Sequence, residues 1–269
     1  MTAIIAWGAA TLLASGVLML LVLAVRAPVS RWVGPRHGYA LWALPAVRML
    51  LPPLPLAMLR PLPLGGNFAG ETSVLLVGPT VASAGSDMPQ MSWLGSALVA
   101  IWLAGAVVLF AVYAVRHGLY CRRVRTQGTA LGRIGTVRIV AADVEGPLAF
   151  GIFRRFIAVP RDFARDYSPR EQDLALAHES AHHARGDLIA NWVSLAVLAA
   201  HWWNPVAWVA IRAFREDQEL AADAHVLADR EPAIRALYAH VLAKAAGVGA
   251  LPACNLNARS NLKGRLMMI

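Results

Sequence analysis

The chain has 269 residues, of which 58% are hydrophobic and 15% charged, and its mean hydropathy is +0.52. This apolar share is far above that of a soluble domain and favours a membrane protein with one folded domain outside the bilayer. The net charge of +9 comes from basic residues beside apolar runs, which favours positive cytoplasmic loops over direct nucleic-acid binding. The two cysteines, Cys121 and Cys254, exclude a disulfide framework and fit a reducing compartment.

Three apolar runs are candidate transmembrane spans. Residues 3–25 and 93–115 carry no charge and are long enough to cross a bilayer as helices. Residues 38–60 contain Arg48 and several prolines, so we expect a bent span there. No basic residue precedes the first run, which favours a retained span over a cleaved signal peptide.

The loops between these runs predict their orientation. Arginines follow the first run and the last run, whereas the Gly/Ser/Pro-rich loop 61–92 has no Lys or Arg. By the positive-inside rule, the N-terminus and loop 61–92 lie outside, and the chain after residue 116 begins in the cytoplasm. We therefore expect a multi-pass protein of a bacterial-type inner membrane, with the lipid bilayer as a partner.

This predicts a transmembrane module over 1–118, a cytoplasmic domain over 119–250 and a basic tail over 251–269. Within the domain, residues 134–160 are expected to form strands, because two β-rich stretches are separated by glycine and proline. The fold class expected is a mainly α membrane protein with an α+β domain.

A helix is predicted over 169–185. Ser168 and Glu171 form a capping-box pattern around Pro169, and Gly186 is suited to end the helix. This helix carries the sequence His178-Glu179-Ser180-Ala181-His182.

The spacing of His178 and His182 places both side chains on the same side of a helix. Residues i and i+4 lie on one face of a helix, so both imidazoles can bind one metal ion, with zinc the expected cofactor. Glu179 lies about 100° around the helix, where it can take a proton from a metal-bound water as a catalytic base. The same pattern also fits a polar helix face with solvated histidines.

A third ligand is found in residues 212–227. Glu219 and Asp223 are four residues apart, so Glu219 can bind zinc while Asp223 accepts a hydrogen bond from a zinc-bound histidine. The alternative is an ordinary charged surface helix. Asp187 is expected to brace the histidine helix, and His225 is a second choice of third ligand.

The other histidines near these motifs are not expected to bind the metal ion. His183 points about 100° away from His182, so it is expected to face solvent or to support the site from outside the ligand set. His201 lies beside two tryptophans and is expected at the membrane interface.

The apolar segment 188–211 constrains the topology. A simple span there would place Glu219 across the membrane from His178, where the two residues could not share a metal ion. The run 188–200 is too short to cross, and Asn204-Pro205 breaks it. We expect a helical hairpin on or in the inner leaflet, with a buried helix pair inside the soluble domain as the alternative.

Three stretches together carry a family resemblance: GPLAFGIFRRFIAVP, SPREQDLALAHESAHHARGDLIANW and HWWNPVAWVAIRAFREDQELAADAHVL. The chain resembles the BlaR/MecR-type antirepressor membrane metallopeptidases. The resemblance implies a gluzincin fold, zinc bound by His178, His182 and Glu219, and Glu179 as the base. It also implies a substrate strand that pairs near Ala149, Phe150 and Gly151.

The same resemblance implies a protein or peptide substrate, either a transcriptional repressor or the chain itself. Such relatives carry an external β-lactam sensor after a further span, whereas this sequence ends at NLNARSNLKGRLMMI, and none of its motifs supports β-lactam sensing. The basic tail is interpreted as a self-cleavage loop or a truncation point.

Two other functions stay open. One is a membrane quality-control protease of the HtpX type, and the other is a non-catalytic metal-binding scaffold or sensor. A protease also needs a donor for the transition-state oxyanion. Tyr238, His240 and Arg235, on a predicted helix over 232–244, are candidates that the sequence cannot rank.

Overall fold

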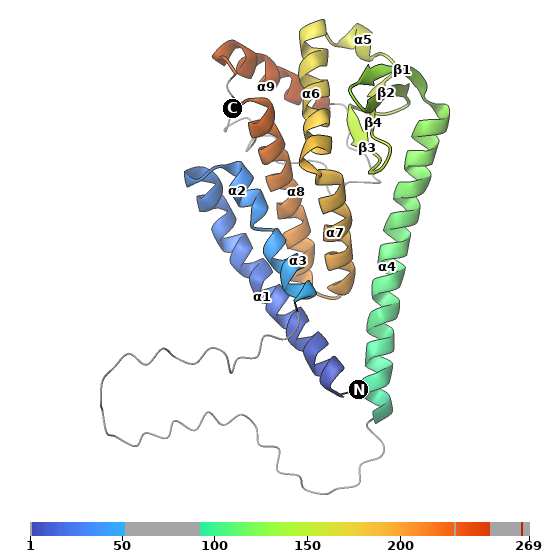
Figure 1. The fold of residues 1–269 in the computed structure, drawn as a ribbon, viewed down its shortest axis with the longest axis vertical. Coiled ribbons are helices and arrows are strands. Elements are labelled where there is room, and N and C mark those ends of the chain that lie inside the picture. The colour runs from blue at the N-terminus through green and yellow to red at the C-terminus, as the bar shows by residue number, and fades with distance from the viewer. Residues whose placement is uncertain (1, 52–91, 229, 248–264, 266–269) are drawn as a thin grey trace, which may run out of the picture.

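The computed structural model describes residues 2–51, 92–228, 230–247 and 265. These residues are mainly helical, with one small mixed sheet, in an elongated molecule (Figure 1). The sheet lies with α6 and α9 toward one end, and the lower parts of α1, α4 and the α7–α8 pair extend toward the other. The predicted combination of apolar helices and an α+β part is therefore present, while the gluzincin fold stays an expectation.

Among the described residues, two helices are long and apolar enough to cross a membrane, over Ala6–Trp32 and Trp93–Gln127. They belong to the helices labelled α1 and α4 in Figure 1. The N-terminal helices are α1 (Thr2–Trp32), α2 (Pro35–Ala40), α3 (Ala43–Leu50) and α4 (Ser92–Gln127). Many apolar side chains of α4 are exposed, as expected of a helix that contacts lipid.

The predicted second span is not one helix in the described part of the chain. Residues 38–50 instead form the end of α2, a turn at Leu41–Trp42 and the short helix α3, which packs back on α1. Helix α3 ends at Leu50, ahead of Pro52 and Pro53, because proline disfavours helix in the residue before it. Residues 52–60, the predicted loop 61–92 except its last residue, and the tail except Arg265 lie outside the described residues.

Four strands form the sheet in the order β1-β2-β4-β3. Their bounds are β1 (Thr129–Ile134), β2 (Val137–Ala142), β3 (Leu148–Phe150) and β4 (Phe156–Pro160). β2 and β4 are parallel, and the two outer pairs are antiparallel. One face of the sheet packs on α6 and α9 and the other on the end of α4, so the strand β3 is left at an edge beside α6.

The remaining helices are α5 (Phe163–Asp166), α6 (Pro169–Arg185), α7 (Asp187–Ala200), α8 (Pro205–Val226) and α9 (Pro232–Gly247). The bounds of α6 agree with the prediction, because Ser168 and Glu171 form the capping box and Gly186 ends the helix at φ 74°. Only glycine adopts that left-handed conformation without strain, and α7 begins at the next residue.

Helices α7 and α8 form a hairpin whose tip is bound to two other helices. His201 Nε2 lies 2.7 Å from Ser15 Oγ of α1, and both side chains are fully buried. The Trp102 indole of α4 donates to the Ala200 carbonyl at 2.8 Å. Gly105 permits this close packing, because a Cβ at that position would lie 2.5 Å from the Trp202 ring.

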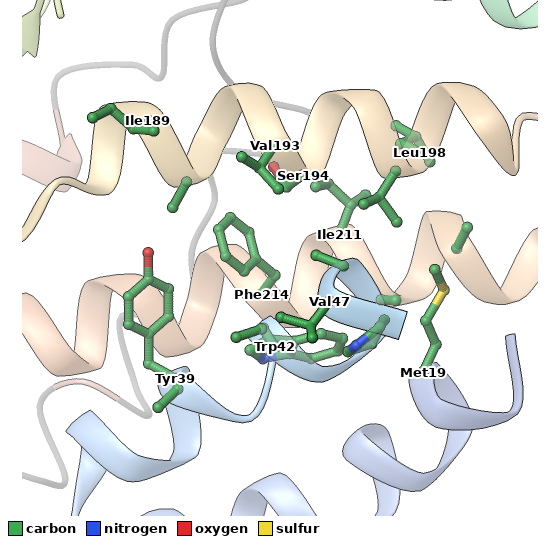
Figure 2. Close-up of a pocket in the computed structure, with 18 of the residues that line it drawn as sticks. Met19, Tyr39, Trp42, Val47, Ile189, Val193, Ser194, Leu198, Ile211 and Phe214 are labelled. Carbon is green, nitrogen blue, oxygen red and sulfur yellow. The ribbon is translucent and has the colours of Figure 1, made fainter. Parts of the chain in front are cut away.

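An apolar cavity of about 510 Å³ lies between the hairpin and the N-terminal helices (Figure 2). Its walls include Met19, Trp42, Ile211 and Phe214. Tyr39 lines the same cavity and accepts a hydrogen bond from Gln218 of α8, the residue before Glu219. The cavity therefore borders the residues that hold the site described next.

Candidate metal centre

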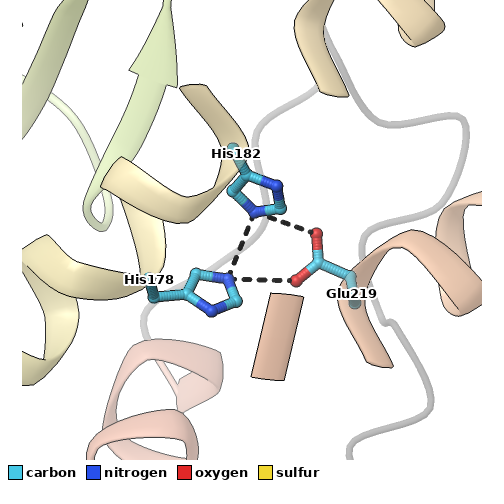
Figure 3. Close-up of side chains that lie close together, drawn as sticks. All are labelled: His178, His182 and Glu219. Atoms are coloured by element: carbon cyan, nitrogen blue, oxygen red, sulfur yellow. Dashed lines mark hydrogen bonds and ion pairs between the residues drawn. The ribbon is translucent and has the colours of Figure 1, made fainter. Parts of the chain in front are cut away.

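His178, His182 and Glu219 come together between α6 and α8, and their ligand atoms all lie within 4.8 Å of one another (Figure 3). His178 Nε2 is 3.2 Å from His182 Nε2 and 3.3 Å from Glu219 Oε2. His182 Nε2 is 3.7 Å from Glu219 Oε1. Helix α7 follows directly on α6, and α8 runs back past α7 to pack beside α6. This hairpin therefore brings Glu219 of α8 to the histidines of α6.

Each histidine is held from behind through its other ring nitrogen. His182 Nδ1 lies 2.8 Å from Asp187 Oδ2 at the start of α7. His178 Nδ1 lies 2.7 Å from the Tyr238 hydroxyl, which donates to Asp223 Oδ1 at 2.7 Å. Asp223 is thus bonded to His178 mainly through Tyr238, since its own distance to that ring nitrogen is 3.4 Å.

These bonds determine which ring nitrogens carry lone pairs. The Asp187 carboxylate only accepts, so His182 must donate from Nδ1. The Tyr238 hydroxyl gives its proton to Asp223, so His178 must also donate from Nδ1. The two Nε2 atoms then point lone pairs at each other and at a carboxylate, an arrangement that positive charge between them, a metal ion or an added proton, would stabilise. The donor set fits a zinc ion, which prefers nitrogen and carboxylate ligands.

The pKa shifts of the site residues also favour positive charge among these side chains. Burial opposes the imidazolium form, but hydrogen bonds and charges from Asp223 and Glu219 raise the pKa of His178 to about 10. Burial favours the neutral acid of Asp223, but its bonds with His178 and Arg265 lower the pKa of Asp223 to about 2. The pKa of Glu219 is likewise held well below its usual range, against burial, by Arg265 and His178.

Glu179 faces the edge of the sheet. Its Oε2 accepts a hydrogen bond from the Ala149 amide of β3 at 2.6 Å. Since β3 pairs with β4 through its other side, this amide lies on the free edge of the sheet, beside the two histidines' helix. Ala149 and Phe150 belong to this edge strand and Gly151 follows it, while their role in pairing with a substrate stays a prediction.

The other predicted residues lie away from the ligand set. His183 is buried and contacts the Phe156 carbonyl of β4 at 2.9 Å, so it joins α6 to the sheet and does not face solvent. His201 is buried at the hairpin tip. His225 is exposed, at the end of α8.

The three oxyanion candidates do not share one location. Tyr238 is fully buried behind His178 with its hydroxyl engaged, which supports a role in orienting that ring. His240 is 67% exposed and lies 3.5 Å from Glu171, and Arg235 bonds to carbonyls of the segment that joins α8 to α9. None of these contacts directs a free donor toward the ligand set.

Sequence reasoning missed two arginines. Arg185 Nε lies 3.4 Å from Asp187, and Arg265 forms a two-pronged ion pair with Asp223 at 2.7 Å. Arg185 adjoins the predicted Asp187 and could have been found from that proximity. Arg265 is 42 residues from Asp223, and no spacing in the sequence connects them.

The first helices hold α8 in place. Arg26 of α1 binds Glu216 at 2.8 Å and Asp217 at 2.9 Å, and the Trp42 indole donates to Asp217 at 2.7 Å. Asp217 is buried, so these two donors provide the partners that a buried carboxylate requires. Because Glu219 is two residues further on, α1 and α2–α3 help to determine its position.

Comparison with known proteins relates this chain to a family of peptidases. A sequence model of the BlaR1 peptidase M56 family matches residues 8–269. The regulatory protein BlaR1 of Bacillus licheniformis is 27% identical over 101 residues, 38% of this chain and 17% of that protein. The methicillin resistance mecR1 protein of Staphylococcus aureus is 24% identical over 87 residues, 32% of this chain and 15% of that protein.

A mecR1 protein of Staphylococcus epidermidis matches to the same extent. In each case the matched segment is less than two thirds of the curated relative. The family match, in contrast, covers nearly all of this sequence. The chain therefore belongs to the BlaR1 peptidase M56 family.

Proposed function

We propose that the protein is a membrane-bound zinc endopeptidase that works on the cytoplasmic side in a signalling relay. The observation that carries this proposal is the convergence of two histidines and a glutamate from α6 and α8, with both Nδ1 atoms bonded from behind and both Nε2 atoms turned inward. Membership of a peptidase family supports the same chemistry.

His178, His182 and Glu219 would hold the zinc ion, which when bound supplies a Lewis acid toward water and a peptide carbonyl. Glu179 is the residue that moves the proton. Its carboxylate accepts one from the attacking water at Oε and returns it to the leaving amine. The bond from the Ala149 amide limits the rotation of Glu179 and keeps this carboxylate at the edge of the sheet.

An extended peptide is the expected substrate. The outer edge of β3 can pair with another strand through backbone hydrogen bonds if the substrate replaces Glu179 as the acceptor of the Ala149 amide, which would place a peptide bond beside Glu179. This mode selects an extended segment, and it fits either a regulator or a loop of the chain itself.

The membrane setting is supported by two long apolar helices and by the position of the basic residues. Arginines of α1 and α4 lie toward the end of each helix that is close to the site, which favours a site at the inner face. The names of the relatives, a regulatory protein and resistance proteins, favour a signalling role over broad quality control.

The test is peptide hydrolysis by purified protein in nanodiscs, comparing wild type with Glu179→Gln. We expect the variant to keep its zinc and to lose hydrolysis by roughly 10²-fold or more. Glu231→Gln, an exposed change at the start of α9, is the matched control. Unchanged hydrolysis in Glu179→Gln would exclude this mechanism.

A second experiment separates the candidate functions. Cleavage of one regulator, or of the chain at one site, is the expected result in a screen of membrane and soluble substrates. Broad cleavage of misfolded membrane proteins would favour the quality-control alternative. A cellular output that does not change in Glu179→Gln would favour the scaffold.

A further inference from the structure

Arg265 lies beside the metal centre, against two acidic residues of α8. Its Nε and Nη2 atoms donate to Oδ2 and Oδ1 of Asp223, both at 2.7 Å. Its Nη1 lies 3.2 Å from Glu219 Oε2, and only 11% of the side chain is exposed. A single guanidinium thus contacts two carboxylates that are one turn apart on α8.

Asp223 needs such a partner. The residue is 4% exposed, and an ionised carboxylate at that depth is unfavourable unless it is paired and hydrogen-bonded. Tyr238 donates to one oxygen of Asp223, and Arg265 is the donor to the other among the described residues. The two-pronged geometry fixes the plane of the carboxylate, which a single hydrogen bond would not do.

The other histidine has the same arrangement. Behind His182 lies Asp187, and Asp187 is contacted by Arg185. Behind His178 lies Asp223, through Tyr238, and Asp223 is contacted by Arg265. In both cases an arginine holds a carboxylate that determines the tautomer of a metal-facing ring.

We propose that Arg265 is a positioning residue of the metal centre: its ion pair fixes Asp223, which orients the Tyr238 hydroxyl and through it the ring of His178. This inference rests on the proposed function, since it assigns a role at the same site. Arg265 acts through Asp223 and Tyr238 and has no direct contact with the reaction.

The contact between Arg265 and Glu219 suggests a different effect on metal binding, which the experiment must distinguish from positioning. If the main effect of Arg265 were to compete with a metal ion for Glu219, its removal would strengthen metal binding. If its main effect is to orient His178, its removal weakens metal binding. We expect the second outcome, because two short bonds go to Asp223 and one longer contact goes to Glu219.

The experiment uses the full chain in nanodiscs, stripped of metal and titrated with zinc against a chromophoric chelator. Arg265→Gln is expected to weaken zinc binding roughly 10-fold or more. Arg265→Lys should weaken it as well, because an ammonium keeps the charge but cannot reproduce the two-pronged pairing. Arg212→Gln, an exposed arginine of α8, is the matched control and should bind as wild type does.

A second readout separates positioning from a general loss of stability. Cobalt(II) loaded in place of zinc reports the ligand geometry through its visible absorption. Arg265→Gln and Asp223→Asn should change that spectrum in the same way. The double variant should lose no more affinity than Asp223→Asn alone, because both residues act through one relay.

Unchanged or tighter zinc binding in Arg265→Gln, with wild-type binding intact, would overturn this inference and leave the proposed function standing. Additive losses in the double variant would overturn it too. Failure of the wild-type chain to bind zinc would instead contradict the proposed function itself.

Discussion

At the scale of single residues, the site depends on the side chains that hydrogen-bond to the two histidines as much as on the three candidate ligands themselves. The spacing of His178 and His182 on one helix and the downstream acidic residue Glu219 led us to expect that the three residues converge, and their ligand atoms do lie together. The bonds to Asp187 and Tyr238 determine which nitrogen of each ring faces inward. Ring orientation is a tertiary property, so spacing along one helix could not predict it.

Replacement of Asp187 tests this support. Asp187→Asn keeps the size of the side chain but removes the charge that holds the His182 proton on Nδ1. We expect zinc affinity to fall by roughly 10- to 100-fold, measured by chelator competition. Asp173→Asn, an exposed aspartate on the same helix as His182, should leave affinity unchanged. Equal affinities in the two variants would contradict the role given to Asp187.

At the scale of elements, local signals predicted the bounds of α6, whereas the described part of the predicted second span is not one helix. The capping residues of α6 act within a few residues, and they determine its start whatever surrounds it. The stretch 38–50 is apolar in sequence, yet it forms α2 and α3 against α1. Hydropathy shows that these residues avoid water, but it does not show whether lipid or the rest of the protein covers them.

The anchoring of α8 is an element-scale prediction. Arg26→Met leaves Asp217 buried without its ion partner, which should destabilise the fold by about 3 kcal/mol. Chemical denaturation in detergent, followed by tryptophan fluorescence, measures this. The control is Arg31→Met, an exposed change one turn further along α1. If Arg26→Met were as stable as Arg31→Met, α1 would not be what holds α8.

At the scale of the whole molecule, the hairpin joins the two halves of the site. Glu219 is 37 residues beyond His182, and the α7–α8 turn lets α8 run back beside α6, so that the two residues lie together. The sequence indicated that the segment must return, because a metal cannot be shared across a bilayer. It could not show that Ser15 and Trp102 bind the tip, since those contacts join segments about 100 or more residues apart.

Labelling from each side of the membrane tests this topology. In a background without Cys121 and Cys254, Arg170→Cys and Arg230→Cys place thiols at exposed positions before and after the hairpin. Both should react with an impermeant reagent only in inside-out vesicles. Reaction from opposite sides would mean that the hairpin crosses the membrane and that the site cannot form.

The central claim is that residues on both sides of the hairpin bind one metal ion, and zinc stoichiometry tests it most directly. Mass spectrometry of purified protein should find about one zinc per chain in wild type and in Glu231→Gln. Glu219→Gln should retain far less after dialysis against a weak chelator, because it loses one of three protein ligands. A full zinc complement in Glu219→Gln, or none in wild type, would contradict the account.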